Sequence, residues 1–368
     1  MVLDVLNDKD TFYLFHRHFM IGRSFTDRFQ AAIWAVSSHA DGMLLEAYQA
    51  ALGLWDMRHN RIKYFREVDV SVGTDCLRIL QNTTTVRRED AAAILMTGQV
   101  LLVYHIATML TSANSILRSA LLAVRPFYPD LLSQPNLDPI TITPILLDTL
   151  ESLIRRETPV IRIPPCDRFI VDRYVGLCWT LLPLLHKLCD CSAQSKASGP
   201  WSPSSTDQGP DNFSDVEHEI RLWEPRPPAS VFADYTTPEI NVMLLQARVY
   251  RAAALLIIHR LRHPLGERDD EALVWANTIM AELTGFIGWA PDDMRGLPIG
   301  LPLLVAMLET RAGGEGERII PQMATFATHP RHASEFRRFV SLVWAAREGG
   351  FRGLWFDLAT SFQMPIVP

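Results

Sequence analysis

Residues 237–283, TPEINVMLLQARVYRAAALLIIHRLRHPLGERDDEALVWANTIMAEL, carry the clearest structural signal in the chain. The stretch predicts a long apolar helix that begins at Thr237 and ends in the run HRLRHP at residues 259–264. A turn is expected at Gly266, and a second helix restarts at Asp269. Because acidic side chains are favoured at the positive end of a helix, the acidic run that starts at Asp269 suits the first turn of that helix.

Helical spacing of apolar residues continues outward from this pair through most of the chain. No convincing alternation of apolar and polar residues, which would predict strands, occurs. The other long helices are expected at residues 41–57, 88–110, 113–124, 143–157, 167–189 and 333–347. Thr143 before Pro144 is typical of a helix start, the prolines of 126–139 predict a loop, and Pro183 must kink or break its helix. We therefore expect an all-α fold, one large multi-helix array over residues 1–368.

One segment differs in composition from the rest. Residues 193–212, AQSKASGPWSPSSTDQGPDN, are dominated by Ser, Pro, Gly, Asp and Gln, and Trp201 is their one large apolar residue. Such a segment cannot bury enough surface to offset its conformational entropy. We expect a mobile loop there.

The overall composition limits the kind of partner. Apolar residues make up 48% of the 368 residues, which is ample for a sizeable core, and charged residues make up 21%. The formal net charge of −6 leaves no basic excess to neutralise phosphates, so this chain alone is not expected to bind nucleic acid. The odd number of cysteines, five, does not resemble a disulfide framework.

Two features bear on the compartment. The first residues, MVLDVLNDKD, lack the basic and apolar regions of a signal peptide, so a cytoplasmic location is expected, with a nuclear one as the alternative. Residues 91–110 are long enough to cross a bilayer and carry no charged side chain, but polar residues interrupt them. A buried central helix is the preferred interpretation, without membrane association.

Several segments carry a resemblance to a known family. They are DAAAILMTGQVLLVYHIATML at 90–110, SILRSALLAVRPFYPDLL at 115–132, DRFIVDRYVGLCWTLLPLLHKLCD at 167–190 and ARVYRAAALLIIHRLRHPLGE at 247–267. Together they resemble the fungal-specific transcription factor domain, the large helical C-terminal region of fungal zinc-cluster regulators. The resemblance implies an all-α regulatory domain whose helices form a shell.

One part of that family is missing from this sequence. The DNA-reading zinc cluster requires six spaced cysteines near the N-terminus, whereas the first cysteine here is Cys76. Two functions are therefore open. The first is a stand-alone relative of the regulatory domain that binds and transforms an apolar secondary metabolite. The second is a transcriptional regulator, or a fragment of one, that lacks its zinc-cluster region.

Metal and cofactor chemistries find little support in the sequence. His186, Cys189 and Cys191 form HKLCDC but lack a fourth ligand, so structural roles are favoured over zinc. The acids at 269–271 lack the one-turn spacing of a magnesium-binding aspartate motif. No GxSxG, HExxH, phosphate-binding loop or dinucleotide fingerprint occurs. No metal and no cofactor is expected.

Hydrogen-bond donors inside apolar helices are the best site candidates. Tyr104 and His105, with Gln99 nearby, interrupt the most apolar helix, so each needs a partner or faces a ligand. Arg251 and His259 form a second pair of donors on one helix face, with ordinary structural pairing as the alternative. Two further residues, Trp179 and Trp275, could line a pocket or pack in the core.

These residues suit chemistry that needs no cofactor. An intramolecular cyclisation of the Diels–Alder type requires a cavity that holds the reactive conformer and a donor that polarises a carbonyl. Isomerisation by an acid–base histidine is also compatible. We therefore expect an apolar pocket in which Tyr104, His105, Arg251 or His259 is catalytic and Gln99, Trp179 and Trp275 contact an apolar substrate. Association into homo-oligomers is left open.

Overall fold

The structure, a computed structural model, describes residues 2–59, 70–83, 86–109, 114–163, 168–197, 212–289, 298–310 and 330–361. Across these ranges the chain is helical and forms no strand, which confirms the all-α prediction. Its buried apolar side chains form one contiguous cluster that reaches from Leu6 to Ala359.

The helices follow one another closely. In chain order they are α1 (Val2–Asn7), α2 (Lys9–His16), α3 (Thr26–Val36), α4 (Met43–His59), α5 (Val70–Asn82), α6 (Ala91–Met109), α7 (Asn114–Val124), α8 (Tyr128–Leu132), α9 (Asp138–Arg155), α10 (Leu182–Ala197), α11 (Ser214–Leu222), α12 (Val231–Asp234), α13 (Thr237–Arg262), α14 (Asp269–Trp289), α15 (Gly300–Glu309), α17 (Pro330–Glu348) and α18 (Trp355–Ser361). Short 3-10 turns connect several of them, including η5 (Arg125–Phe127), η6 (Pro135–Leu137) and η7 (Cys178–Leu181).

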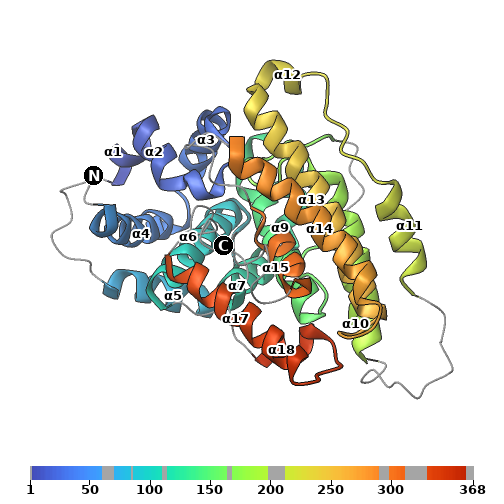
Figure 1. Cartoon of the computed structure of the whole chain (residues 1–368). Coiled ribbons are helices and arrows are strands. Elements are labelled where there is room, and N and C mark those ends of the chain that lie inside the picture. The colour runs from blue at the N-terminus through green and yellow to red at the C-terminus, as the bar shows by residue number, and fades with distance from the viewer. Residues whose placement is uncertain are drawn as a thin grey trace.

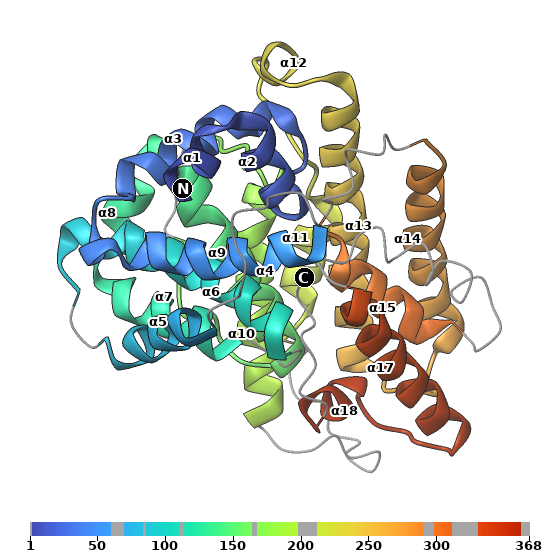
Figure 2. The same cartoon turned by 90° about the vertical axis from the view of Figure 1, so that its left-hand side faces the viewer.

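Two groups of helices lie on either side of α9. On one side, α6 packs against α4 and α7, and the N-terminal helices adjoin them. On the other, α13 and α14 run side by side as the longest pair, with α15 against both (Figure 1). Figure 2 shows the two groups after a quarter turn, with α5 and α8 toward the left and α14 toward the right. Helix α9 contacts α3, α6 and α7 as well as α10 and α18, and all its residues except Arg155 are buried.

The predicted helix pair has the predicted bounds. Thr236 caps α13: its hydroxyl accepts the backbone N–H of Glu239, and the Glu239 carboxylate accepts the backbone N–H of Thr236. After α13 the chain turns at Gly266, whose φ of +93° lies in the left-handed region that favours glycine. Helix α14 then starts at Asp269.

The expected loop at 126–139 was wrong. The structure places η5, α8, η6 and the start of α9 there. The prolines of this region lie in the first turns of these short elements, where the missing N–H is not needed. Helix α9 also starts earlier than expected, at Asp138, so that Pro144 lies inside it.

The expected helix at 167–189 was wrong in its first half. Among the residues described there, the chain forms a tight turn closed by a bridge between Asp172 and Gly176. The Asp172 carboxylate accepts the backbone N–H groups of Tyr174 and Val175, each at 2.9 Å, and so competes with helix formation. Helix α10 begins only at Leu182, and Pro183 occupies its first turn rather than a kink.

The expected loop at 193–212 overlaps α10. Residues 193–197 form the last turn of that helix. Residue 212 is described as part of a turn, and 198–211 lie outside the described residues.

The apolar segment at 91–110 is buried as expected. Helix α6 covers most of it, and its first twelve residues are all buried. By length and composition, α13 is the described helix that could cross a bilayer, and 78% of its most apolar window is buried inside the protein.

Candidate functional site

Tyr104 and His105 lie in the second half of α6. Tyr104 is buried against α5, where a Cβ added to Gly73 would lie 2.2 Å from its ring carbon Cζ. Glycine at 73 therefore makes room for the tyrosine. His105 is half-buried, and this burial lowers the pKa of its imidazole. Tyr104 thus packs between α6 and α5.

Gln99 serves the backbone of α9. Pro144 has no N–H, so the carbonyl of Ile140 one turn earlier loses its helical donor. The Gln99 amide nitrogen donates to that carbonyl at 2.9 Å. Gln99 of α6 thus satisfies the carbonyl that Pro144 leaves without a helical donor in α9.

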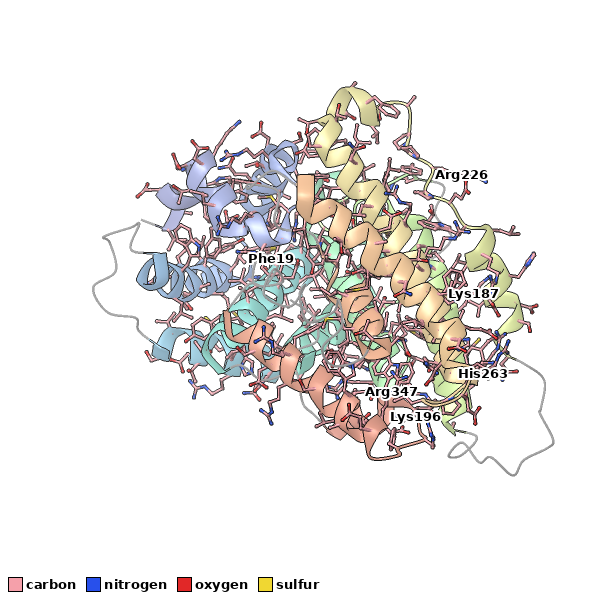
Figure 3. All side chains as sticks on the ribbon, viewed as in Figure 1. Phe19, Lys187, Lys196, Arg226, His263 and Arg347 are labelled. Carbon is pink, nitrogen blue, oxygen red and sulfur yellow. The ribbon has the colours of Figure 1, made fainter. Side chains whose placement is uncertain are left out.

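The same region contains a buried arginine. Arg173 is 3% exposed, and its guanidinium lies 3.8 Å from the ring centroid of Phe29. It donates to the Pro139 carbonyl at 2.9 Å, the Phe19 carbonyl at 2.5 Å and the Gln99 side-chain oxygen at 3.2 Å. Figure 3 labels Phe19, between the N-terminal helices and the centre of the molecule. These bonds tie the N-terminal segment to α6 and α9.

Arg251 and His259 lie on α13 and point to its neighbours. Arg251 donates to the backbone carbonyl of Arg221 on α11. His259 Nε2 donates to the carbonyl of Arg268 at 3.1 Å, and burial lowers the pKa of the ring, as do the charges of Arg260 and His263. These two side chains join helix ends, and they lie on a different helix group from Tyr104 and His105.

The two tryptophans have different surroundings. Trp179 is 4% exposed and belongs to the apolar core. Trp275 on α14 is half-buried, and the Arg221 guanidinium lies 5.5 Å from its ring centroid.

The run HRLRHP is organised around Arg260. This side chain is 1% exposed and donates to the Glu309 carboxylate, with Nε–Oε1 at 2.7 Å, and to Asp269 Oδ1 at 2.8 Å. Its remaining N–H groups donate to the carbonyls of His263, Pro264 and Glu267. Arg347 on α17 joins the same cluster through Asp269 Oδ2 at 2.9 Å. Figure 3 labels His263 and Arg347 near this end of the α13–α14 pair.

The metal candidates are paired with other groups. Among the described residues, no group of three or more His, Cys, Asp or Glu side chains could hold a metal ion. His186 Nε2 and the Thr149 hydroxyl lie 3.0 Å apart, and the Cys189 thiol contacts the Thr149 carbonyl at 3.7 Å. Asp269 binds Arg260, as described above, and accepts the Gly266 N–H in the turn before α14.

A surface pocket lies elsewhere, between α7, η5, α8 and the segment at 158–162. It has a volume of about 520 Å³, and none of the seven candidate residues lines it. We call it the α7–α8 pocket. Its lining residues are Arg118, Leu122, Arg125, Tyr128, Pro129, Leu132, Thr158, Pro159, Val160, Ile161 and Arg162.

The wall at 158–162 is fixed by the end of α9. Arg156 adopts a left-handed φ of +56°, which stops the helix and redirects the chain. Asp148, which is 1% exposed, then accepts the backbone N–H of Val160 at 2.5 Å. Burial raises the pKa of the Asp148 carboxyl, against the opposing effects of this hydrogen bond and of Arg118.

The three arginines of the pocket differ in how their charge is balanced. Arg118 lies 3.4 Å from Asp148 and 3.8 Å from Glu157. Arg162 pairs with Asp190 at 2.7 Å, and its side chain is 63% exposed. The exposed side chain of Arg125 has no hydrogen bond or ion pair with any residue that the structure describes. The lining thus holds one positive charge without a partner.

A weak signal of this pocket was present in the sequence. Arg118, Leu122 and Arg125 are four and three residues apart, the spacing of one helix face. The apolar spacing of this run predicts a helix and does not by itself indicate a pocket. The remaining lining residues come from two other segments, whose arrangement depends on the prolines before α9 and on the left-handed end of α9.

Comparisons with family models, with curated proteins and with solved structures found no match to this chain. The resemblance to the fungal-specific transcription factor domain therefore stays a prediction from the sequence. Function has to be argued from the geometry of the pocket.

Proposed function

We propose that this chain binds a small apolar molecule and that the α7–α8 pocket is the binding site. The observation that carries the proposal is a hollow of about 520 Å³ that combines Leu, Ile, Val, Pro and Tyr side chains with three arginines and a threonine. Small-molecule sites typically have roughly 300–1,000 Å³ and combine apolar walls with a few polar groups. The pocket meets both conditions.

The lining supports binding more directly than proton transfer. Among the described lining residues there is no His, Asp, Glu, Cys or Lys. Tyr128 donates its hydroxyl hydrogen to the Thr141 carbonyl at 2.5 Å, and burial raises the pKa of that hydroxyl well above its ordinary value. None of these described residues therefore offers a group that releases or accepts protons near neutral pH. Ligand binding of this kind suits a helical regulatory domain, as the family resemblance implies.

A cofactor-free cyclase is the second candidate. The observation that favours it is a guanidinium, that of Arg125, at the edge of an apolar hollow. Such a donor can polarise a substrate carbonyl while the walls hold a reactive conformer, and this is enough for an intramolecular cycloaddition. Conversion of a bound polyene or enone in the presence of the protein, and its loss on blocking the pocket, would distinguish the two candidates.

The test of binding uses a neutral apolar dye, Nile red, and a variant that fills the pocket. Leu122 is 54% exposed at the pocket, and Leu222 is 69% exposed on α11. We expect saturable binding of one dye per chain to the wild type. Leu122→Trp should weaken it by roughly tenfold, equal to about 1.4 kcal/mol, and the matched control Leu222→Trp should leave it unchanged. Equal effects of the two variants, or no saturable binding, would overturn the proposal.

A further inference from the structure

We infer, on the basis of the function proposed above, that the natural ligand of the α7–α8 pocket is an amphipathic monocarboxylate. Its apolar body lies on the Leu122, Leu132 and Ile161 side of the hollow, and Arg125 binds its carboxylate. This ligand differs from the purely apolar substrate that the sequence analysis predicts.

The charge balance of the lining gives the sign and size of the ligand charge. The described lining residues contribute three arginines and no acid, in a chain whose formal net charge is −6. Arg118 and Arg162 already have carboxylate partners in Asp148, Glu157 and Asp190. Arg125 therefore supplies the one uncompensated charge among the described lining residues, which fits a monoanion better than a phosphate dianion.

The geometry of the Arg125 guanidinium favours a carboxylate as the anion. A guanidinium presents parallel N–H groups at the spacing of the two oxygens of a carboxylate, so a bidentate pair forms with no rearrangement of the protein. Arg162 is already paired with Asp190 at 2.7 Å, so it does not add a second free donor. Arg118 is not available, since buried Asp148 depends on it.

The apolar side chains of the lining favour a ligand whose carboxylate is attached to an apolar group. Leu122 is 54% exposed beside the arginines and Pro129 is also exposed, whereas Leu132 and Ile161 are already covered by the protein. An inorganic anion would leave the side chains of Leu122 and Pro129 in contact with water. An alkyl or aryl group attached to the carboxylate covers them, and apolar surface is removed from water in proportion to the area covered.

The test compares ligands that share a body or a head group, by isothermal titration calorimetry on the full chain. We expect octanoate to bind at least tenfold more tightly than octan-1-ol and than inorganic phosphate. Arg125→Gln should abolish the preference of octanoate over octanol. The matched control is Arg337→Gln, at an exposed arginine on α17 that also lacks a partner among the residues described. It should retain the preference.

Each contrary outcome has a separate meaning. If octanol binds as tightly as octanoate while Nile red still binds in the pocket, the inference that the ligand carries a carboxylate is wrong, and the proposed function stands. If phosphate or octyl phosphate binds more tightly than octanoate, the choice of a monocarboxylate is overturned. If octanoate gives no saturable heat, the inference fails, and the Nile red titration shows independently whether the proposed function fails with it.

Discussion

Arg260 and Arg125 carry the same guanidinium group in opposite surroundings. Arg260 is 1% exposed and donates to two carboxylates and three backbone carbonyls. Arg125 is exposed at the edge of a pocket, and its side chain has no partner among the described residues. Arg260 lies in the Arg-rich end of an apolar helix, and Arg125 directly follows another apolar helix. The sequence pattern therefore does not show which of the two is paired. The two differ in hydrogen bonding: the N–H groups of Arg260 are paired within the protein, whereas those of Arg125 have no partner among the described residues.

Three of the donors selected from the sequence resemble Arg260 more than Arg125. A donor inside an apolar helix must be paired, because a buried polar group without a partner costs about 1–3 kcal/mol. Gln99, Arg251 and His259 accordingly bind backbone carbonyls. A ligand-binding donor has to remain accessible, and such residues are more easily found at a hollow on the surface.

The largest expected effect concerns the Arg260 cluster. Arg260→Met leaves the buried Glu309 carboxylate with Arg347 alone, at 3.6 Å, and removes the donor of three backbone carbonyls, so we expect the free energy of unfolding to fall by about 3–5 kcal/mol. The double variant Arg260→Met with Glu309→Leu removes both charges and should recover most of the loss. Urea unfolding measures both values.

The control for this experiment is Arg78→Met on α5, which breaks the exposed pair with Asp75. Its cost should be below about 1 kcal/mol. A single variant at Arg260 as stable as the wild type would show that the cluster is not a buried ion pair in solution.

The next largest loss of stability is expected for a variant of Gln99. Its effects on stability and on dye affinity distinguish a structural role of this residue from a ligand-binding role. Gln99→Leu leaves the Ile140 carbonyl, which Pro144 deprives of its helical donor, without a partner. We expect the free energy of unfolding to fall by about 1–3 kcal/mol and Nile red affinity to stay the same. A variant with unchanged stability but weakened dye binding would return Gln99 to the ligand site.

The helix pair at 237–283 was predictable because its signals are local. Thr236 and Glu239 cap the first helix, Gly266 provides the left-handed turn, and the acids at 269–271 start the second helix. Each of these acts within a few residues along the chain. The α9 region was not predictable in the same way, because its prolines suggest a break.

What keeps α9 continuous comes from distant parts of the chain. The carbonyls of Pro139, Ile140 and Thr141, just before Pro144, accept hydrogen bonds from Arg173, Gln99 and Tyr128 respectively. No local pattern reveals such partners. The α7–α8 pocket is equally non-local, since it combines a helix, a proline-rich turn and a segment anchored by Asp148.

The free energy of unfolding is expected to depend on pH through His16, whose ring is buried. His16 Nδ1 donates to the Phe12 carbonyl and Nε2 accepts from the Tyr48 hydroxyl, each at 2.9 Å, and burial lowers the pKa of the ring to about 3. Between about pH 6.5 and 3 the unfolded chain therefore binds a proton that the folded chain does not. Stability is present above this window and falls by about 1.4 kcal/mol per pH unit as the pH decreases through it.

The variant His16→Gln isolates this contribution. The free energy of unfolding of the variant lacks the His16 term, and subtraction removes the contributions of other titrating groups. The stability advantage of the wild type should therefore shrink by about 2 kcal/mol from pH 7 to pH 5. An advantage that stays constant over this range would mean that His16 takes up its proton equally in both states.

The smallest losses of stability are expected for the arginines of the α7–α8 pocket. Variants at these positions compare paired and unpaired arginines within one site. Arg118→Gln removes the charge next to buried Asp148, and we expect a loss of about 1–3 kcal/mol in the free energy of unfolding. Arg162→Gln breaks an exposed pair and should cost less than about 1 kcal/mol. Arg125→Gln removes no contact with the described residues and should change stability by less than about 0.5 kcal/mol. Since stability and carboxylate affinity are predicted to depend on different arginines, a large stability loss for Arg125→Gln would show that its charge is already used within the protein, and Arg125 would no longer be available for a ligand.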